Sequence, residues 1–382
     1  METDLYEADH EAYRETAREF IRREVVPKVD GWDRQRAVDR ETWTKAGAAG
    51  LTGLAVPERF GGAGVSDYRY RFVVSEEIAN VGAAALQSSF GVNDDIVLGY
   101  LLEQATEEQK ARWLPGFASG ETISAIAMSE PEAGSDLRGV VTQAVRRGDG
   151  WLLNGSKTFI SNGVLADLVI VFAKTDQTEG AGGYSLFVVE RGMPGFERGR
   201  KLDKVGLPAQ DTAELFFRDV EVPADNLLGG VGEGLRSLMR NLPRERLGIA
   251  VAAQCSAEAS LRWTLDYVRQ RRAFGRTVAQ FQTVGFALAE LRTQVEVTRA
   301  YLDRCVRQLN AGTLSAVDAA KAKWWATDVQ WKVIDTGVQL HGGYGYMTEY
   351  PIARAFMDAR VQRIYGGTNE IMKEIISRDL LR

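Results

Sequence analysis

The chain has 382 residues, of which 45% are hydrophobic and 26% are charged, a balance typical of a globular protein with two or three domains. Its net charge of −5 disfavours a nucleic-acid binder. No run of about 18 apolar residues predicts a membrane span. The two cysteines cannot form a disulfide framework and the two histidines cannot form a histidine-rich zinc site, so we expect a cytoplasmic protein without a metal centre.

The first 120 residues have the pattern of a helical domain. Tyr13, Ala17 and Phe20 recur at helical spacing, with charged residues between them. Pro27 predicts the end of this helix. The segment from Thr106 to Gln109 has the sequence of a capping box, which predicts that another helix begins there.

Residues 121–228 have β character instead. Short β-prone runs follow one another without helices between them, which predicts an antiparallel barrel or sandwich rather than a doubly wound nucleotide-binding sheet. Gly148, Asp149 and Gly150 predict a hairpin turn. The predicted strands are Val140–Val145, Trp151–Leu153, Leu168–Phe172, Tyr184–Val189 and Ala213–Phe217.

Residues 229–382 return to helical patterns. Leu288, Leu291, Val295 and Val306 fall on one helix face, and a second helical pattern covers 324–340. Long helices with short connections predict a bundle. The sequence therefore predicts an α+β multi-domain protein with an N-terminal helical domain (1–120), a middle antiparallel β domain (121–228) and a C-terminal helical bundle (229–382).

Six separated motifs carry the functional signal. In this order they resemble the acyl-CoA dehydrogenase family, and the resemblance covers the chain from about residue 10 to its end. The C-terminal half is most similar to the long-chain and isovaleryl branches of that family. The motifs are Ala127–Asp136, Lys157–Gly163, Asp211–Leu215, Arg271–Gly275 followed by Gln282, Gln339–Tyr346 and Ile364–Ile371.

The resemblance implies a fold with a C-terminal four-helix bundle and an FAD enzyme that forms a 2,3-double bond in an acyl thioester. Such an enzyme needs a base for the α proton, donors for the thioester oxygen and a flavin placed against the β carbon. It also implies an acyl-CoA substrate, an electron-transferring flavoprotein as electron acceptor, and a homotetramer built as a dimer of dimers.

The catalytic base is the least conventional feature. Many family members carry a glutamate where this chain has Gly366, whereas the long-chain and isovaleryl branches carry it on an earlier helix. The segment Leu242–Leu247 matches that alternative, so we predict Glu245 as the base. Taken alone, Glu245 is an ordinary surface carboxylate. Pro243 predicts a kink or restart of the helix, and burial or freed N–H groups would shift the pKa of Glu245 in opposite directions.

The remaining cofactor and substrate contacts follow from the resemblance, residue by residue. The thioester oxygen is expected at the N–H of Gly366, beside Gly367, with Ser135 and Arg246 as further substrate contacts. Taken singly, these residues are also typical of cores, turns, caps and solvated helix faces. The predicted FAD contacts are Met128, Ser129, Phe159 and Ser161 near the ring, Arg271, Gln282, Gln339, Gly342 and Gly343 toward a neighbouring subunit's FAD, and Ser135, Ile160, Phe274, Thr368 and Glu370 elsewhere in the cofactor site.

Other functions of the same scaffold stay open at this point. An acyl-CoA oxidase would pass electrons to oxygen, a carrier-protein thioester could replace CoA, and a non-catalytic scaffold protein would lack the chemistry. His341 is predicted to be a packed residue, because the proposed chemistry gives it no proton to move. Cys255 and Cys305 lie on apolar helix patterns and are predicted to be core thiols. The length and branching of the acyl chain are not predicted.

Overall fold

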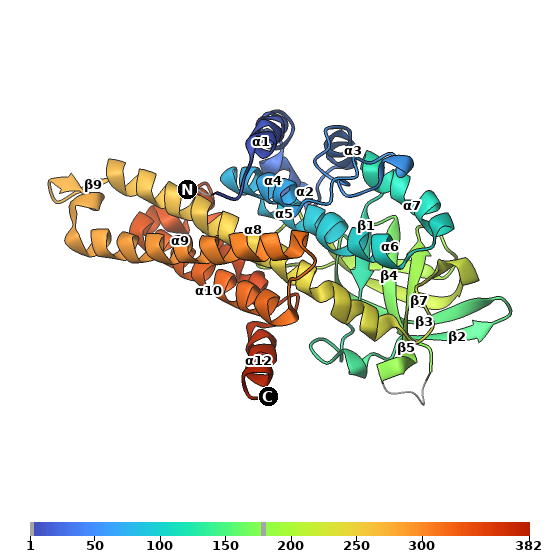
Figure 1. The fold of residues 1–382 in the computed structure, drawn as a ribbon. Coiled ribbons are helices and arrows are strands. Elements are labelled where there is room, and N and C mark those ends of the chain that lie inside the picture. Colours follow the sequence, from blue (N-terminus) through green and yellow to red (C-terminus); the bar gives the residue numbers. More distant parts are fainter. Residues whose placement is uncertain (1–3, 177–180) are drawn as a thin grey trace.

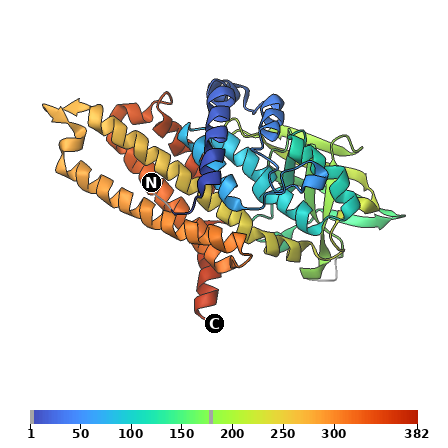
Figure 2. The same cartoon turned by 45° about the horizontal axis from the view of Figure 1, so that its top comes forward.

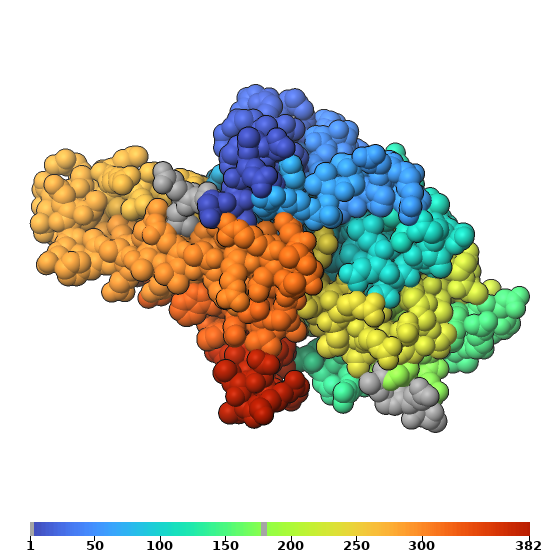
Figure 3. Space-filling view, in the orientation of Figure 1, coloured from blue at the N-terminus to red at the C-terminus, as the bar shows by residue number. Residues whose placement is uncertain are grey.

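The computed structural model describes residues 4–176 and 181–382, and Figure 1 shows helices, then strands, then helices again along the chain. The order of elements confirms the predicted fold class. In Figure 3 the N-terminal helices cover the upper part of the molecule, and the C-terminal helices and the β domain lie to either side below them. Among the described residues, no helix is long and apolar enough to cross a bilayer.

The N-terminal part consists of short helices, as predicted. The first helix stops being α-helical at Phe20 and its continuation ends before Pro27. The capping box also forms, because the backbone N–H of Gln109 donates to the Thr106 hydroxyl over 3.2 Å and the Thr106 N–H donates back over 2.9 Å. The elements are α1 Ala8–Phe20, η1 Ile21–Val25, α2 Val29–Gln35, α3 Arg40–Ala48, η2 Glu58–Phe60, α4 Tyr68–Asn80, α5 Ala84–Gly91, η3 Val92–Val97, α6 Leu98–Gln104 and α7 Glu107–Ser119.

The middle part is one twisted sheet in the order β6-β7-β3-β2-β4-β5-β8, with β1 paired to β4. All pairs along this order are antiparallel except β2 with β4, and β1 also runs parallel to β4. The hairpin at residues 148–150 is confirmed, since Arg147 pairs with Gly150. The strands are β1 Ser124–Ala127, β2 Gln143–Arg147, β3 Gly150–Ser161, β4 Leu168–Lys174, β5 Tyr184–Glu190, β6 Phe196–Lys201, β7 Thr212–Val222 and β8 Leu227–Leu228.

Three long helices, α8 Gly234–Gln270, α9 Gln282–Asn310 and α10 Ala316–His341, run side by side in the C-terminal part (Figures 1 and 2). Two shorter helices, α11 Pro351–Ala359 and α12 Asn369–Leu380, pack against α10 in place of a fourth long helix. The small hairpin β9 Arg272–Ala273 and β10 Arg276–Thr277 connects α8 to α9 at the far end. Short 3-10 turns link the remaining elements of both halves: η4 Leu137–Gly139, η5 Ala181–Gly183, η6 Ala224–Asn226, η7 Val278–Gln280, η8 Gly342–Tyr346 and η9 Arg360–Arg363.

Helix α8 joins the three parts of the molecule. It packs against α4, α6 and η3 of the N-terminal part, against β5 and against α10. The predicted restart at Pro243 was wrong, because α8 continues through this residue without a break. Contacts on both sides of Pro243 hold the flanking turns in place. The stabilisation from this packing therefore exceeds the cost of the backbone hydrogen bond that proline removes.

Candidate active site

Glu245 lies inside the molecule, where α6 meets α8. Its side chain is buried with 4% of its surface exposed, so the interpretation as a surface carboxylate was wrong. The hydroxyl of Tyr100 donates a hydrogen bond to Glu245 Oε1 over 2.7 Å. Tyr100 itself is held in the core cluster that joins α6 and α7 to the sheet. Among the described residues, Tyr100 is therefore the one hydrogen-bond donor to this carboxylate, and it is anchored in the core.

Burial decides the ionisation of Glu245. Loss of solvent raises the pKa of this carboxyl group to about 7, against the opposing effects of the Tyr100 hydrogen bond and the charge of Arg246. The freed N–H groups expected beside Pro243 play no part, because the helix does not open there. A carboxylate with a pKa near neutrality can be ionised at physiological pH and still accept a proton, which suits a general base.

The loop at Gly366 lies against the same part of α8. Arg246 Nε donates toward the carbonyl oxygen of Gly366 over 3.4 Å. A Cβ built on Gly366 would lie 2.3 Å from Cδ1 of Ile249, which follows Glu245 by four residues and so shares its helix face. Gly366 also has a left-handed φ of 63°, which favours glycine. The structure thus brings the predicted base and the predicted glycine loop together.

The amide groups of this loop point to a role in binding an anion or a carbonyl oxygen. Among the described residues, no acceptor takes a hydrogen bond from the N–H groups of Gly366, Gly367 or Thr368. Thr368 caps α12, as its hydroxyl accepts from Ile371 N–H over 3.3 Å, so the positive end of that helix dipole lies beside the glycines. The side chain of Glu370 is exposed in the first turn of α12, and its pKa is lowered by hydrogen bonds with the helix N-terminus.

One residue at this loop had no signal in the sequence. Lys323 on α10 is fully buried, and its Nζ donates to the Gly367 carbonyl over 2.8 Å and to Asn369 Oδ1 over 2.9 Å. Burial, together with the charge of Arg246, lowers the pKa of Lys323 to about 7. A lysine within an amphipathic helix is ordinarily solvated, so only the fold identifies this contact.

The predicted flavin-ring residues form a second group, on β1 and β3. Phe159 has a left-handed φ of 59° within a bulge of β3 and is 70% exposed, so it is not a barrel-core residue. Such an exposed aromatic in a strained position is typical of a binding surface. Next to it, Ser161 is half-buried, whereas the Ile160 side chain packs in the sheet core and leaves only its backbone for a ligand.

A buried ion pair fixes the chain around Met128 and Ser129. Lys157 Nζ donates to the Met128 carbonyl and to Glu130 Oε1, each over 2.9 Å. The N–H of Thr158 donates to the Ser129 carbonyl over 3.0 Å. These contacts hold the segment after β1 beside β3, and sequence reasoning missed them because the pair is formed by residues 27 positions apart. Ser135, in contrast, lies in an exposed loop after this segment.

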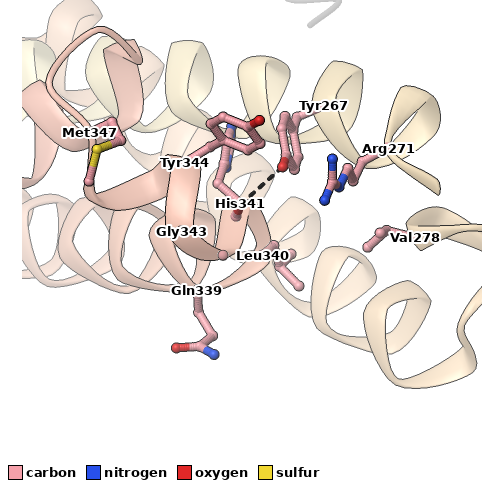
Figure 4. Close-up of a pocket in the computed structure, with 10 residues that line it drawn as sticks. Tyr267, Arg271, Val278, Gln339, Leu340, His341, Gly343, Tyr344 and Met347 are labelled. Atoms are coloured by element: carbon pink, nitrogen blue, oxygen red, sulfur yellow. Dashed lines mark hydrogen bonds between the residues drawn. The ribbon is translucent and has the colours of Figure 1, made fainter. Parts of the chain in front are cut away.

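The third group surrounds a cavity of about 470 Å³ at the opposite end of the helices (Figure 4). The guanidinium of Arg271 lies 5.6 Å from the ring centroid of Tyr344, and both line the cavity with Gln339, Gly342 and Gly343. Figure 4 shows the Gln339 side chain pointing away from Arg271. Phe274, in the adjacent hairpin, is 93% exposed, and Gln282 is exposed at the start of α9.

His341 is a packed residue, as predicted. Its ring stacks on Tyr267 at a centroid distance of 4.2 Å, and its Nδ1 lies 2.7 Å from the Gly337 carbonyl. Burial lowers its pKa, which favours the neutral form of the ring. Cys255 and Cys305 are free and buried, which confirms them as core thiols.

Comparisons with known proteins agree with this arrangement. Models described as the N-terminal, middle and C-terminal domains of acyl-CoA dehydrogenase match residues 7–121, 125–220 and 232–381. The chain belongs to the acyl-CoA dehydrogenase family. The predictions of the family, of an enzyme of its kind and of its fold are thereby confirmed.

Individual members of the acyl-CoA dehydrogenase family match nearly the whole chain. The mitochondrial long-chain specific acyl-CoA dehydrogenase of Sus scrofa is 49% identical over 379 residues, which are 99% of this chain and 87% of the relative. An acyl-CoA dehydrogenase structure from Geobacillus kaustophilus has a TM-score of 0.97 and 46% identity, covering 99% of this chain and 100% of that one. A Mycobacterium smegmatis glutaryl-CoA dehydrogenase in complex with FADH2 has a TM-score of 0.91 and 28% identity over 98% of this chain and 95% of that one.

The side chains present fit a flavin dinucleotide. An exposed aromatic at Phe159 offers a face for a flat ring, and Arg271 beside a cavity offers a guanidinium that matches phosphate oxygens. Figure 1 places β3 and the β9 hairpin at opposite ends of the molecule, so one chain does not bring both groups to one cofactor.

Proposed function

We propose that this chain is an FAD-dependent acyl-CoA dehydrogenase that forms a 2,3-enoyl thioester, with Glu245 as the base. The observation that carries the proposal is the buried Glu245 carboxylate, hydrogen-bonded to Tyr100, on the turn of α8 whose Arg246 contacts the Gly366 loop, where the amides donate to no described acceptor. A base and a set of amide donors on neighbouring elements are the two protein groups that removal of an α proton from a thioester requires.

The roles of the residues follow from this geometry. Glu245 takes the α proton as the Cα–H bond breaks, and the N–H of Gly366 holds the thioester oxygen as charge develops on it. FAD, when bound, supplies the acceptor for the hydride that leaves the β carbon, so that a carbon–carbon double bond forms and two electrons leave the substrate. Arg246, buried beside Glu245, and Gly367 complete the substrate side of the site.

We further propose that each FAD is held between two copies of the chain. Met128, Ser129, Phe159, Ile160 and Ser161 of one copy would hold the ring, with Thr368 and Glu370 completing the cradle. Arg271 of the second copy would clamp the pyrophosphate. Gln282, Gln339, Gly342 and Gly343 of that copy would bind the adenosine end. The separation of the two groups in one chain supports a dimer as the minimal unit, and the resemblance to the family extends this proposal to a dimer of dimers.

The finer assignments belong to the same proposal. We place the domain limits at 1–120, 121–228 and 229–382. We propose an electron-transferring flavoprotein as the electron acceptor. We also propose that the protein is cytoplasmic, where its two buried thiols stay reduced. Ser135 keeps a proposed contact with CoA or FAD because its loop is exposed and follows the segment of Ser129.

Anaerobic flavin bleaching tests the proposal. We expect the wild type to bleach with at least one member of a panel of acyl-CoAs that varies in length and branching. Glu245→Gln should bind the same thioester but reduce at least about 100-fold more slowly, because the amide cannot accept the proton. Stopped-flow absorbance gives the rate, and equilibrium dialysis gives the binding.

Each other outcome identifies a different function. Normal bleaching by Glu245→Gln would show that the base lies elsewhere. Peroxide release with oxygen as electron acceptor would identify an oxidase. Bleaching only by an acyl carrier-protein thioester would show that the substrate is attached to a carrier protein rather than to CoA. A protein that does not take up FAD would be a scaffold without catalysis. Glu233→Gln, at the exposed start of α8, is the matched control and should bleach at the wild-type rate.

A further inference from the structure

The two glycines at 366–367 have flexible backbones, so the orientation of their peptide groups must be fixed by neighbouring residues. Both residues have left-handed φ values, 63° and 89°, and glycine loses more freedom on folding than any other residue. A donor stabilises a developing charge only if it is held in place before the reaction. Whatever fixes these two peptide units therefore determines how well the proposed oxygen site works.

Two buried side chains hold the carbonyl side of the loop. Arg246 Nε approaches the Gly366 carbonyl at 3.4 Å, a weak contact, whereas Lys323 Nζ donates to the Gly367 carbonyl at 2.8 Å. In a trans peptide the C=O and N–H groups point in opposite directions. Anchoring these carbonyls on the side of α8 and α10 consequently turns the N–H groups of Gly367 and Thr368, which share those peptide units, away from the helices, and no described residue accepts from them. The N–H of Gly366 belongs to the preceding peptide unit, so Lys323 acts on it through the loop rather than directly.

Lys323 is itself held on several sides. Its second acceptor is Asn369 Oδ1 at 2.9 Å, and the Asn369 amide donates to the Thr327 hydroxyl and to Asp328 Oδ1, each at 3.0 Å. Asn369 is the first residue of α12, so the same network fixes the helix whose N-terminus adjoins the loop. The charged groups near the ammonium are Arg246, Glu370, Asp328 and Arg363.

We propose that Lys323 is a positioning residue, which orders the Gly366–Gly367 loop so that its amides are preset for the thioester oxygen. Lys323 acts through the loop and does not touch the reacting atoms. This inference rests on the proposed role of the Gly366 amide. Both the amine and the ammonium form of lysine donate hydrogen bonds, so the proposal depends on the donors rather than on the charge.

A chromophoric thioester tests this directly. The probe is para-dimethylaminocinnamoyl-CoA, whose absorption moves to longer wavelength when its thioester oxygen accepts strong hydrogen bonds. We expect a clear shift on binding to the wild-type holoenzyme and a smaller shift with Lys323→Met. With an oxidisable acyl-CoA, the same variant should lose about tenfold to 100-fold in kcat with KM changed less than about twofold, in keeping with loss of a support behind catalytic donors. Lys323→Arg, which keeps donors at this position, should recover part of both effects.

The controls separate the possible failures. Lys373→Met removes an exposed lysine of α12 and should leave the shift and kcat unchanged. A Lys323→Met protein with the wild-type shift and kcat would overturn the proposal. An absent shift in the wild type would instead overturn the Gly366 oxygen contact and the inference with it, while leaving Glu245 as base. If Lys323→Met does not fold, Asn369→Ser removes one of the two acceptors and should reduce the shift in the same direction; an unchanged shift there would also overturn the proposal.

Discussion

At the scale of single residues, the main result is the environment of Glu245. The sequence motif singled out this glutamate, but two opposite pKa shifts were open. The fold decides between them because the partner, Tyr100, lies 145 positions away and donates only one hydrogen bond, while burial removes nearly all solvent. No local sequence pattern around Glu245 indicates that Tyr100 is its partner or that its side chain is buried. Tyr100 lies in a largely apolar helix, and the sequence did not single it out as a partner of Glu245.

The pH dependence of activity should report this balance. Glu245 acts as a base only when ionised, so kcat/KM should be lost as pH falls through its pKa of about 7. Tyr100→Phe removes a hydrogen bond that favours the carboxylate, so the pKa should rise by about one unit and the acid limb should move to higher pH. The measurement is the rate of anaerobic reduction between acid and alkaline pH. A limb that stays in place would show that Tyr100 does not tune the base.

At the scale of elements, much of the architecture was predictable. The predicted helices and strands overlap observed ones, but their limits differ: the strand expected at Val140–Val145 is β2 at Gln143–Arg147, and the one expected at Trp151–Leu153 extends to Ser161 as β3. Strand β6 was missed because Phe196–Lys201 is mostly polar, and β1 because four small or apolar residues cannot be distinguished from a loop. The continuity of α8 through Pro243 depends on packing from three sides, which no local pattern encodes.

The contact between α8 and the glycine loop gives a second prediction. Gly366→Ala places a methyl group 2.3 Å from Ile249 Cδ1 and in a left-handed conformation, so we expect a loss of about 1–3 kcal/mol in stability and about tenfold or more in kcat/KM. Adding Ile249→Ala removes the steric part and should restore some activity. Thermal melting and steady-state rates measure the two effects. Equal activity of the single and double variants would show that the backbone conformation, rather than the contact, limits the site.

At the scale of the whole molecule, the residues that we propose for flavin binding are divided between two distant regions, the group on β1 and β3 and the group around the Arg271 cavity. Sequence order alone gives no distance between Phe159 and Arg271; the family resemblance implied that they serve different FAD molecules, and the fold places β3 and the β9 hairpin far apart (Figure 1). Several large apolar side chains are exposed around the Arg271 cavity and the β9 hairpin, which is typical of an interface. They are Phe274, Phe286, Tyr344, Tyr346 and Met347.

Association should therefore be coupled to cofactor retention. Phe274→Asp places a charge in the exposed hairpin, so it should weaken self-association and lower the flavin content, although Phe274 is far from β3 in the same chain. Light scattering and the ratio of flavin to protein absorbance check this. Val145→Asp, an exposed apolar position on β2, is the control and should change neither quantity. Full flavin content in a monomeric Phe274→Asp protein would contradict the shared site.

The distance between these two regions also allows defective subunits to complement each other. Phe159→Ala damages the ring side of each site, and Arg271→Ala damages the phosphate side. In a hybrid of the two polypeptides, both lesions fall in one site, while the other site receives an intact half from each parent. Two inactive preparations, dissociated and reassembled together, would then recover part of the wild-type turnover.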